Sequence, residues 1–600
     1  MKRFAARLQG FTRFLFAIGL AATATAWAQN LPIVSGEPVV GTPKAAQTLG
    51  LLTTEEEMPA RRLRLAAPSR AELSFADKAD AAAKRVKIGF GREVAVHAVE
   101  GTGDKLAWSS VGEWRIAKLR VQSPGAASLR VGLRIGATRQ PWVLRVAGSD
   151  DESKSLGPLR MAGPLGQAET YWTPLTEGDA QVIEIASPAS QPEPFVQVAT
   201  VSHVVASPSS QFRKTASDIG RSETCNIDVA CVSNPPQGLL NAANAVVHML
   251  ATKPSGGSFL CTGTLLVDLH PGDQIPYLLS ANHCFEADSA PYYTAQQMQQ
   301  VASSLNTFFF FSAATCNSLA TPPYVQRFNG ATYLHHSLSQ DVLFLRLNEW
   351  APAGAFLAGW DANPVPIGTS ITVLHHPYGD LKKYTSGTVR ALETLSSPLN
   401  APTGYWRAEY NQGITEPGSS GSALLSFSST TGQYHVRGTL SYGNIFVCSS
   451  RQTNGYYVGN DWYSRFDVAY ADVRQWLEAT SLPDFDVTDL WFDPSESGWG
   501  MNLTQHPSGN VFGVWYTYAA DSGPLWLVMT GGSWVTSRTF TGALYRTSGP
   551  GYNQPTFDPA RVKLNPVGSI TLNFSDANTG SFTWVVDGVQ GTKAIIRQGF

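Results

Sequence analysis

The sequence predicts a mainly β protein of several domains, and three observations support this prediction. The chain has 600 residues, which exceeds one ordinary domain of roughly 100–200 residues. Its 54 glycines and 11% aromatic residues are typical of many short strands joined by tight turns. Because 43% of the residues are hydrophobic and only 15% are charged, a charged disordered polymer is excluded and several cores can form.

The charge balance indicates whether a nucleic acid is an expected partner. Lysine and arginine number 44 against 46 aspartates and glutamates, a formal net charge of −2, and no run of basic residues stands out. A dedicated nucleic-acid binder usually carries a basic excess. We therefore expect no nucleic-acid partner.

Residues 1–28 have the pattern of a secretory signal peptide. Basic residues precede an apolar stretch over residues 14–26, and Ala26-Trp27-Ala28 offers the small residues that a signal peptidase requires. This stretch is shorter than the about 20 residues that cross a bilayer, and no later segment reaches that length. We expect a protein without a membrane span, secreted to the extracellular space through the periplasm.

Two segments of different composition follow. Residues 29–85 are rich in alanine, proline and charge and predict a loosely ordered arm. From residue 86 to 205 the pattern becomes strand-like, and a polar stretch over residues 207–223 then forms a linker. Apolar and basic residues alternate in three segments, which predicts half-buried strands over residues 86–90, 114–121 and 128–134.

All six cysteines lie in the middle of the chain. An even number of cysteines in an exported protein favours disulfides, and 15 pairings are open. The Cys-x-x-Cys spacing of a zinc site is absent, so we expect no metal. The cluster marks residues 222–482 as one disulfide-stapled domain, which ends after an amphipathic helix over residues 468–479. The cysteines are Cys225, Cys231, Cys261, Cys284, Cys316 and Cys448.

Three residues of this domain stand where a reactive site could form. His283 ends an apolar strand beside Cys284, Asp341 precedes the alternating strand 342–347, and Ser420 lies in a glycine-flanked turn. Each alone also fits a core histidine, a solvated acid or an ordinary loop. Together, in the order His, Asp, Ser, they match a chymotrypsin-type triad.

The chemistry of such a triad requires these residue types. Serine is a weak nucleophile until an imidazole takes its proton, and a buried carboxylate orients that imidazole. A glycine two residues before the serine lets the backbone direct N–H groups at the developing oxyanion. Here the donors would be the N–H groups of Gly418 and Ser420.

The central domain resembles the lysyl endopeptidases, secreted bacterial serine proteases. The resemblance covers about 260 residues and rests on segments that recur in the order and approximate spacing of that family. These segments are residues 225–231 (CNIDVAC), 261–265 (CTGTL), 283–284 (HC), 358–361 (AGWD), 375–377 (HHP) and 415–422 (TEPGSSGS).

The resemblance implies a fold class and a set of site residues. The fold would be a central trypsin-like double β-barrel with a C-terminal helix, preceded by a β-rich pro-domain and followed by a small all-β domain. The triad would be His283, Asp341 and Ser420, with no cofactor. The implied disulfides are Cys225–Cys448, Cys231–Cys316 and Cys261–Cys284, and the last closes a loop around His283, worth about 3 kcal/mol in the loop-entropy model.

The resemblance also implies a substrate-binding region. Asp461 would be the acid at the floor of the pocket for the residue before the scissile bond, where a substrate lysine or arginine pairs with it. The alternative is an aspartate in an exposed loop. Ser441, Tyr442 and Gly443 would form the strand that pairs with an extended substrate, and the Ser441 hydroxyl would hydrogen-bond Asp341.

Two departures from the family affect specificity and activation. Lysyl endopeptidases carry a histidine where Ser441 stands and a tryptophan near the substrate, for which residues 391–405 offer no counterpart. The choice between lysine and arginine therefore stays open. Ser419 replaces the aspartate that precedes the nucleophile in animal trypsins, so pairing of that aspartate with a new N-terminal amine is unavailable.

The N-terminal flanking region follows from the same resemblance. Residues 29–221 occupy the place of a propeptide, and Lys214 and Arg221 are sites where the enzyme could cut itself. A separate resemblance concerns residues 486–600. Their segments 497–503 (SGWGMNL), 574–575 (FS) and 580–584 (GSFTW) are similar to those of a β domain appended to secreted proteobacterial proteins. Five tryptophans there could form a core or a binding face: Trp491, Trp499, Trp515, Trp526 and Trp534.

The function expected is a secreted, monomeric serine endopeptidase that cleaves protein or peptide substrates after lysine, with arginine left open. Two alternatives remain. A glutamyl-specific relative is disfavoured, because an acid at the pocket floor would repel its substrate. A binding or adhesion protein on a relic protease fold is disfavoured because all three triad residues are present.

Overall fold

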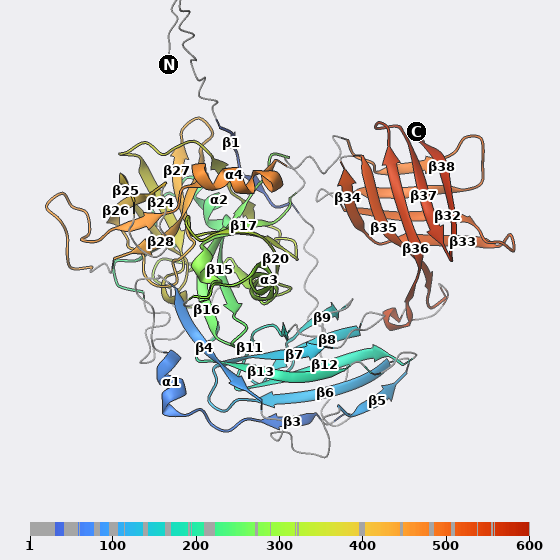
Figure 1. The fold of residues 1–600 in the computed structure, drawn as a ribbon, viewed down its shortest axis with the longest axis horizontal. Coiled ribbons are helices and arrows are strands. Elements are labelled where there is room, and N and C mark those ends of the chain that lie inside the picture. The colour runs from blue at the N-terminus through green and yellow to red at the C-terminus, as the bar shows by residue number, and fades with distance from the viewer. Residues whose placement is uncertain are drawn as a thin grey trace, which may run out of the picture.

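The computed structural model is built mainly of strands (Figure 1). We refer to residues 31–208 as the N-terminal region, 222–478 as the central domain and 485–598 as the C-terminal domain. The structure describes residues 31–40, 58, 60–76, 85–94, 106–112, 114–135, 142–161, 170–189, 193, 195–208, 222–270, 274–287, 290–318, 320, 323–394, 403–444, 448–478, 485–505, 510–536, 538–551, 553, 556 and 558–598.

The first half of the central domain is an antiparallel sheet whose strands are mostly buried. Every residue of β16 and β17 is buried, which suits their unbroken runs of apolar and small side chains. Helix α3 (Ala295–Ser303) packs mainly on β20 of this half, whereas helix α2 (Gln237–Ala245) contacts β15 and β16 of this half and also a strand of the second half. The strands are β15 (Val246–Thr252), β16 (Ser258–Leu266), β17 (Tyr277–Ser280), β18 (Asn306–Phe309), β19 (Val325–Arg327), β20 (Ala331–Ser337) and β21 (Val342–Leu347).

The second half closes into a barrel, because β28 pairs with both β27 and β29. Helix α4 (Phe466–Leu477) follows it and begins two residues before the predicted helix, since Phe466 packs against Trp360 in the core. The strands are β24 (Ser370–His375), β25 (Lys383–Glu393), β26 (Tyr405–Gln412), β27 (Ala423–Ser428), β28 (Gln433–Gly443) and β29 (Asp461–Tyr463), with β14 (Ile227–Asp228) paired to β25.

Three disulfides staple this domain. They join Cys225 to Cys448, Cys231 to Cys316 and Cys261 to Cys284, the pairs that the resemblance implies. The first and second bridges span 223 and 85 residues of sequence, so each ties the start of the domain to a distant part. The third links β16 to the turn that carries His283.

The N-terminal region is a sandwich of two sheets. A 6-stranded sheet contains β3 (Arg61–Arg64), β5 (Trp108–Val111), β6 (Trp114–Gln122), β8 (Trp142–Gly148), β9 (Ser155–Met161) and β12 (Ala180–Pro188). The facing strands are β4 (Val86–Glu93), β7 (Ser128–Ile135), β10 (Thr170–Trp172), β11 (Thr176–Glu177) and β13 (Val196–Val204). The three strands predicted from alternation are present as β4, β6 and β7.

The prediction of half-buried strands was wrong for β7, in which every residue except Arg134 is buried. One face of β7 packs into the sandwich core through Leu129, Val131 and Leu133. The other face meets the central domain through the fully buried Arg130, which donates there to Thr252 Oγ1 at 2.8 Å and Ser304 O at 2.6 Å. Arg130 also donates to Thr173 O of its own region at 2.9 Å. Burial lowers the pKa of Arg130 to about 9.

One sheet runs through both regions. Strand β4 pairs with β13 on one side and with β16 of the central domain on the other, so the 12-stranded sheet is continuous across the boundary (Figure 1). A hydrophobic cluster fills the junction with side chains from both regions. It contains Val86, Ile88, Leu175, Val204 and Ala206 from one side and Leu250, Leu260, Phe308, Phe311, Ala313 and Leu381 from the other.

The prediction of a loosely ordered arm was wrong for the described residues before 85. Strand β1 (Ile33–Val34) pairs with β23 (Gly359–Asp361), and β2 (Glu37–Pro38) pairs with β22 (Phe356–Leu357). A Cβ on Gly36 would lie 2.4 Å from the Phe356 ring, so only glycine fits there. Such short strands, and helix α1 (Arg70–Ala76), leave no periodic pattern in the sequence.

The C-terminal domain is a separate 9-stranded sheet that closes on itself through a β33–β35 pairing. Trp491 and Trp515 are buried in its core and Trp499 and Trp534 pack against it, whereas Trp526 is 64% exposed. The tryptophans thus mainly form a core. The strands are β30 (Asp489–Phe492), β31 (Gly500–Gln505), β32 (Val511–Tyr518), β33 (Pro524–Met529), β34 (Gly532–Thr536), β35 (Thr539–Ser548), β36 (Lys563–Phe574), β37 (Thr579–Val586) and β38 (Val589–Arg597).

Several predictions fall on residues that the structure does not describe. The signal peptide 1–28, the cleavage candidates Lys214 and Arg221, and most of the linker over residues 207–223 lie outside the described residues. Within the described part of the chain, no helix has the length and apolar character that a membrane crossing would need.

Arg130→Ala should destabilise the full chain by about 3 kcal/mol, because the substitution leaves three buried polar partners without their donor. The melting temperature of full-length protein measures this loss. Arg134→Ala is the matched control, since Arg134 lies on the same strand but is exposed, and it should change stability by less than about 0.5 kcal/mol. Equal effects of the two substitutions would show that Arg130 is not an anchor.

Candidate active site

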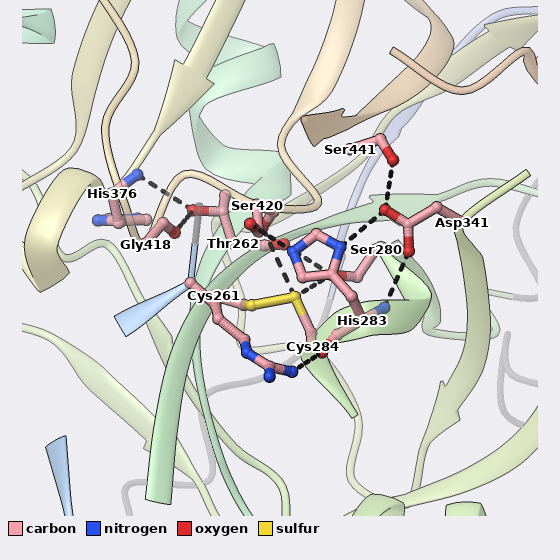
Figure 2. Close-up of a disulfide and its surroundings, with 11 residues drawn as sticks. Cys261, Thr262, Ser280, His283, Cys284, Asp341, His376, Gly418, Ser420 and Ser441 are labelled. Carbon is pink, nitrogen blue, oxygen red and sulfur yellow. Dashed lines mark hydrogen bonds and ion pairs between the residues drawn. A yellow bond between two sulfur atoms is a disulfide. The ribbon is translucent and has the colours of Figure 1, made fainter. Parts of the chain in front are cut away.

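His283, Asp341 and Ser420 are brought together between the two halves of the central domain (Figure 2). His283 lies in the 3-10 turn Asn282–Cys284 that follows β17, and Asp341 directly precedes β21. Ser420 lies in the loop between β26 and β27. The first half of the domain thus supplies the histidine and the aspartate, and the second half supplies the serine.

The three side chains form one hydrogen-bonded chain. His283 Nε2 lies 2.7 Å from Ser420 Oγ, and His283 Nδ1 lies 2.7 Å from Asp341 Oδ2. Both hydrogen bonds of the imidazole are therefore in place without substrate. In Figure 2 the His283 ring lies between Ser420 and Asp341, with the Cys261–Cys284 disulfide beside it.

Asp341 is fully buried and is held by further donors. The backbone N–H of His283 donates to Asp341 Oδ1 at 2.9 Å, and the Ser441 hydroxyl donates to Oδ2. Asn282 N–H also donates to the Asp341 carbonyl at 3.2 Å. These bonds stabilise a buried carboxylate that would otherwise be costly to desolvate. They fix both its oxygens relative to the imidazole.

The loop around Ser420 depends on two glycines with positive φ. Gly418 has φ +95°, and a Cβ there would lie 2.7 Å from His376 O. Gly421 has φ +80°, and its Cβ would lie 2.1 Å from Ser280 Oγ. Only glycine tolerates this backbone at such close contact. The turn places the N–H groups of Gly418 and Ser420, the predicted oxyanion donors, at the bend.

Backbone hydrogen bonds tie this loop to both halves of the domain. Thr262 N–H of β16 donates to Ser420 O at 2.8 Å, and the Thr262 hydroxyl donates to Gly418 O at 3.0 Å. On the other side, Gly421 N–H donates to Leu440 O of β28 at 2.9 Å. Ser420 therefore lies between β16 and β28.

Asp461 opens β29 and is fully buried, so it is not in an exposed loop. Its Oδ2 accepts hydrogen bonds from Tyr410 at 2.8 Å and from Thr415, which lies in the segment leading to Ser420. Burial and the neighbouring Asp461 raise the pKa of Tyr410, so its hydroxyl stays protonated as a donor. Asp461 also pairs in register with Gly443 at the end of β28.

The predicted substrate strand, Ser441 to Gly443, is the last part of β28. Tyr442 packs edge-on against Tyr405, with ring centroids 6.2 Å apart. Tyr442 and Gly443 face β29 in register with Trp462 and Asp461. The structure thus brings all four predicted substrate-binding residues together where the end of β28 pairs with the start of β29.

The sequence analysis assigned no role to His375, which supports Ser419. His375 Nδ1 lies 2.7 Å from Ser419 Oγ and its Nε2 lies 3.0 Å from Thr385 Oγ1. Ser419 Oγ also accepts from Glu416 N–H at 3.2 Å. This buried network holds the residue next to Ser420, the position for which the sequence predicted that the aspartate of animal trypsins is replaced. The His-His-Pro segment was the only sequence signal for it.

Comparisons with known proteins show the family of this chain. The family model "Lysyl endopeptidase N-terminal domain" matches residues 64–205, and "Lysyl endopeptidase, C-terminal domain" matches residues 219–464. The lysyl endopeptidase of Pseudomonas aeruginosa is 30% identical over 434 residues, which cover 70% of this chain and 85% of that protein. This chain belongs to the lysyl endopeptidase family. It is a serine endopeptidase, and its substrates are proteins or peptides.

Solved protease structures are similar to parts of this lysyl endopeptidase family member. The inactive form of the Rv3671c protease of M. tuberculosis is 15% identical, covers 42% of this chain and 96% of its own, and has a TM-score of 0.26. The HtrA-type protease AlgW with a tripeptide is 13% identical, covers 60% of this chain and 95% of its own, and also has a TM-score of 0.26.

Two further histidines of the protease are buried beneath the Ser420 loop. His248 stacks on His376, with ring centroids 5.1 Å apart, and packs against Phe308 and Phe311. Burial lowers the pKa of His248 to about 3 and also lowers that of His376. The nearby Lys382 is buried as well, and burial lowers its pKa to about 7. Within the described residues, no cluster of side chains suited to hold a metal ion is present.

These buried histidines predict a loss of stability in acid. The unfolded chain binds a proton on each histidine below about pH 6.5, whereas folded His248 stays neutral down to about pH 3. The free energy of unfolding should therefore fall as the pH falls below 6.5, by up to about 1.4 kcal/mol per pH unit for His248. His248→Leu should reduce this slope by that amount.

Urea unfolding midpoints between about pH 7 and pH 5 measure the slope. Phe308→Leu is the control, because it alters packing against the same ring without removing a titrating group. The slope should then stay at its wild-type value. Identical slopes in wild type and His248→Leu would contradict the prediction.

Proposed function

We propose that this protein is a secreted serine endopeptidase that hydrolyses peptide bonds after lysine, with arginine left open, through the triad His283, Asp341 and Ser420. The observation that carries the proposal is the continuous hydrogen-bonded chain from Asp341 through His283 to Ser420, with both imidazole contacts at 2.7 Å. Secretion is supported by the signal-like residues 1–28 and by three disulfides, which persist in oxidising compartments.

The mechanism follows from which atoms face each other. Asp341 accepts from His283 Nδ1–H, which leaves Nε2 free of a proton and able to take the one on Ser420 Oγ. The oxygen then attacks the substrate carbonyl, and the negative charge that forms on its oxygen is bound by Gly418 and Ser420 N–H. The imidazolium returns its proton to the leaving amine, and water hydrolyses the acyl-enzyme by the same steps.

A basic residue before the scissile bond, lysine or arginine, is supported by Asp461. Its carboxylate is buried beside the Ser420 segment and is oriented by Tyr410 and Thr415. A substrate ammonium would compensate this buried negative charge, whereas a substrate glutamate would be repelled. The glutamyl alternative is therefore disfavoured. A relic fold is disfavoured as well, because a binding protein would gain nothing from an assembled triad.

The N-terminal region is proposed to be a propeptide, within residues 29–221, that precedes a protease domain over residues 222–482. The support is its junction with the central domain, where Arg130 forms hydrogen bonds and the shared hydrophobic cluster packs side chains of both regions together. Residues 486–600 would be an appended domain, and the enzyme would act as a monomer.

Ser420→Ala should abolish hydrolysis of peptides after lysine, because it removes only the attacking oxygen. Residual turnover of roughly 10³–10⁴ over water can remain from the oxyanion donors. A fluorophosphonate probe should label Ser420 in the wild type and leave the variant unlabelled. The variant should also keep its precursor length, whereas N-terminal sequencing of wild type should find a start near Thr215 or Ser222. Wild-type activity in the variant would refute the assignment.

Asp461→Asn should reduce kcat/KM for substrates with lysine before the scissile bond by roughly two orders of magnitude. This corresponds to a loss of about 3 kcal/mol of transition-state stabilisation. The amide keeps the hydrogen bonds to Tyr410 and Thr415 but loses the charge. Substrates with an uncharged residue there should be affected little. Asp361→Asn, which removes the partner of Arg437 elsewhere in the domain, serves as the control. An equal fall for both substrate classes would mean that Asp461 is structural.

A further inference from the structure

Arg85 of the N-terminal region lies directly beside the triad. Its guanidinium Nη1 donates a hydrogen bond to the backbone carbonyl of His283, and its carbon Cζ lies 5.1 Å from the centroid of the Phe259 ring. The side chain is buried, with 7% of its surface exposed. A carbonyl and an aromatic face thus bind an arginine next to the residue that takes the proton of Ser420.

The strand that follows Arg85 pairs with β16 in the way that a bound peptide would pair with the edge of a sheet. Val86 pairs antiparallel with Leu260 and Lys87 with Phe259, along an edge of β16 that β17 leaves open. Leu260 precedes Thr262, whose N–H binds the Ser420 carbonyl, by two residues, or about 7 Å of strand. Adding a strand to an exposed sheet edge is a general mode of peptide recognition.

The position of Ser420 shows which side of the cleft this edge serves. Ser420 lies between β16, through Thr262, and β28, through Leu440. Under the proposed function, the substrate residues before the scissile bond pair with β28 at Ser441 to Gly443. The edge of β16 then remains for the residues after that bond. Arg85 directly precedes Val86, which pairs with Leu260. It therefore occupies the position expected for the first substrate residue after the scissile bond.

We propose that Phe259 and the His283 carbonyl form a subsite for an arginine side chain at the first substrate position after the scissile bond. In the full chain Arg85 fills this subsite, and the N-terminal region lies on the leaving-group side of the cleft. The inference rests on the proposed function and adds a second specificity element to it. Lys84 precedes Arg85 in the sequence, so the pair has the order of a substrate with lysine before the bond and arginine after it.

Lys253 brings a second positive charge to Phe259, and this like charge works against a bound arginine. Lys253 Nζ lies 4.3 Å from the centroid of the same ring, so the ring contacts two cations at once. Arg85 is accommodated beside Lys253 because its guanidinium also binds the His283 carbonyl. A planar guanidinium, with several N–H donors, can make both contacts together, which a smaller side chain cannot.

The test compares two peptides that differ at one residue, with processed wild-type enzyme. Both carry lysine before the scissile bond, and either arginine or alanine follows it. The arginine peptide should have a kcat/KM about two- to fivefold higher, the range that a cation–π contact of about 0.5–1 kcal/mol provides. In Phe259→Leu this ratio should approach one. In Phe427→Leu, which changes a 51% exposed phenylalanine of β27, the ratio should stay at its wild-type value.

The ratio of the two kcat/KM values is taken within each variant, so a general loss of activity in that variant cancels. Cleavage of both peptides with a ratio of one in the wild type, or a ratio that Phe259→Leu leaves unchanged, overturns the subsite and leaves the proposed function intact. Failure to cleave either peptide after lysine overturns both proposals. An alanine preference in the wild type would likewise refute an arginine subsite.

Discussion

The carbonyl oxygen of Ser420 accepts a hydrogen bond from Thr262 N–H at 2.8 Å, and this contact joins the two halves of the central domain beside His283 and Asp341. His283 and Asp341 belong to the first half and Ser420 to the second. A shift of about 1 Å between the halves would break the contact between Ser420 and the imidazole. The backbone bond to β16 therefore helps to set the distance between Ser420 Oγ and the His283 imidazole.

Much of this site could be predicted from sequence because its determinants are local. His283 follows an apolar strand, Asp341 precedes one, and the glycines around Ser420 are required by a turn with positive φ. Such features leave a pattern within a few residues. The strands β4, β6 and β7 were found for the same reason, since alternation is a property of neighbouring residues.

Features that depend on distant contacts could not be predicted in this way. The alternation over residues 128–134 predicted a half-buried strand, yet Arg130 is buried. Its partners Thr252 and Ser304 lie more than a hundred residues away in sequence. The role of His375 depends on Ser419, and the position of Arg85 depends on an edge of β16. Nothing in the residues near these side chains signals the partner, and only the folded chain supplies it.

The 12-stranded sheet passes through both regions, so separating them would also break the backbone pairing between β4 and β16. Dividing it leaves β16 with an unpaired edge in the protease and β4 with an unpaired edge in the detached fragment. Open edges recruit further strands, and the fragment would also bare Val86, Ile88 and Val204. A freed fragment of this kind is a template for aggregation unless it is degraded quickly. A protease that cleaves its own precursor would have the means to remove it.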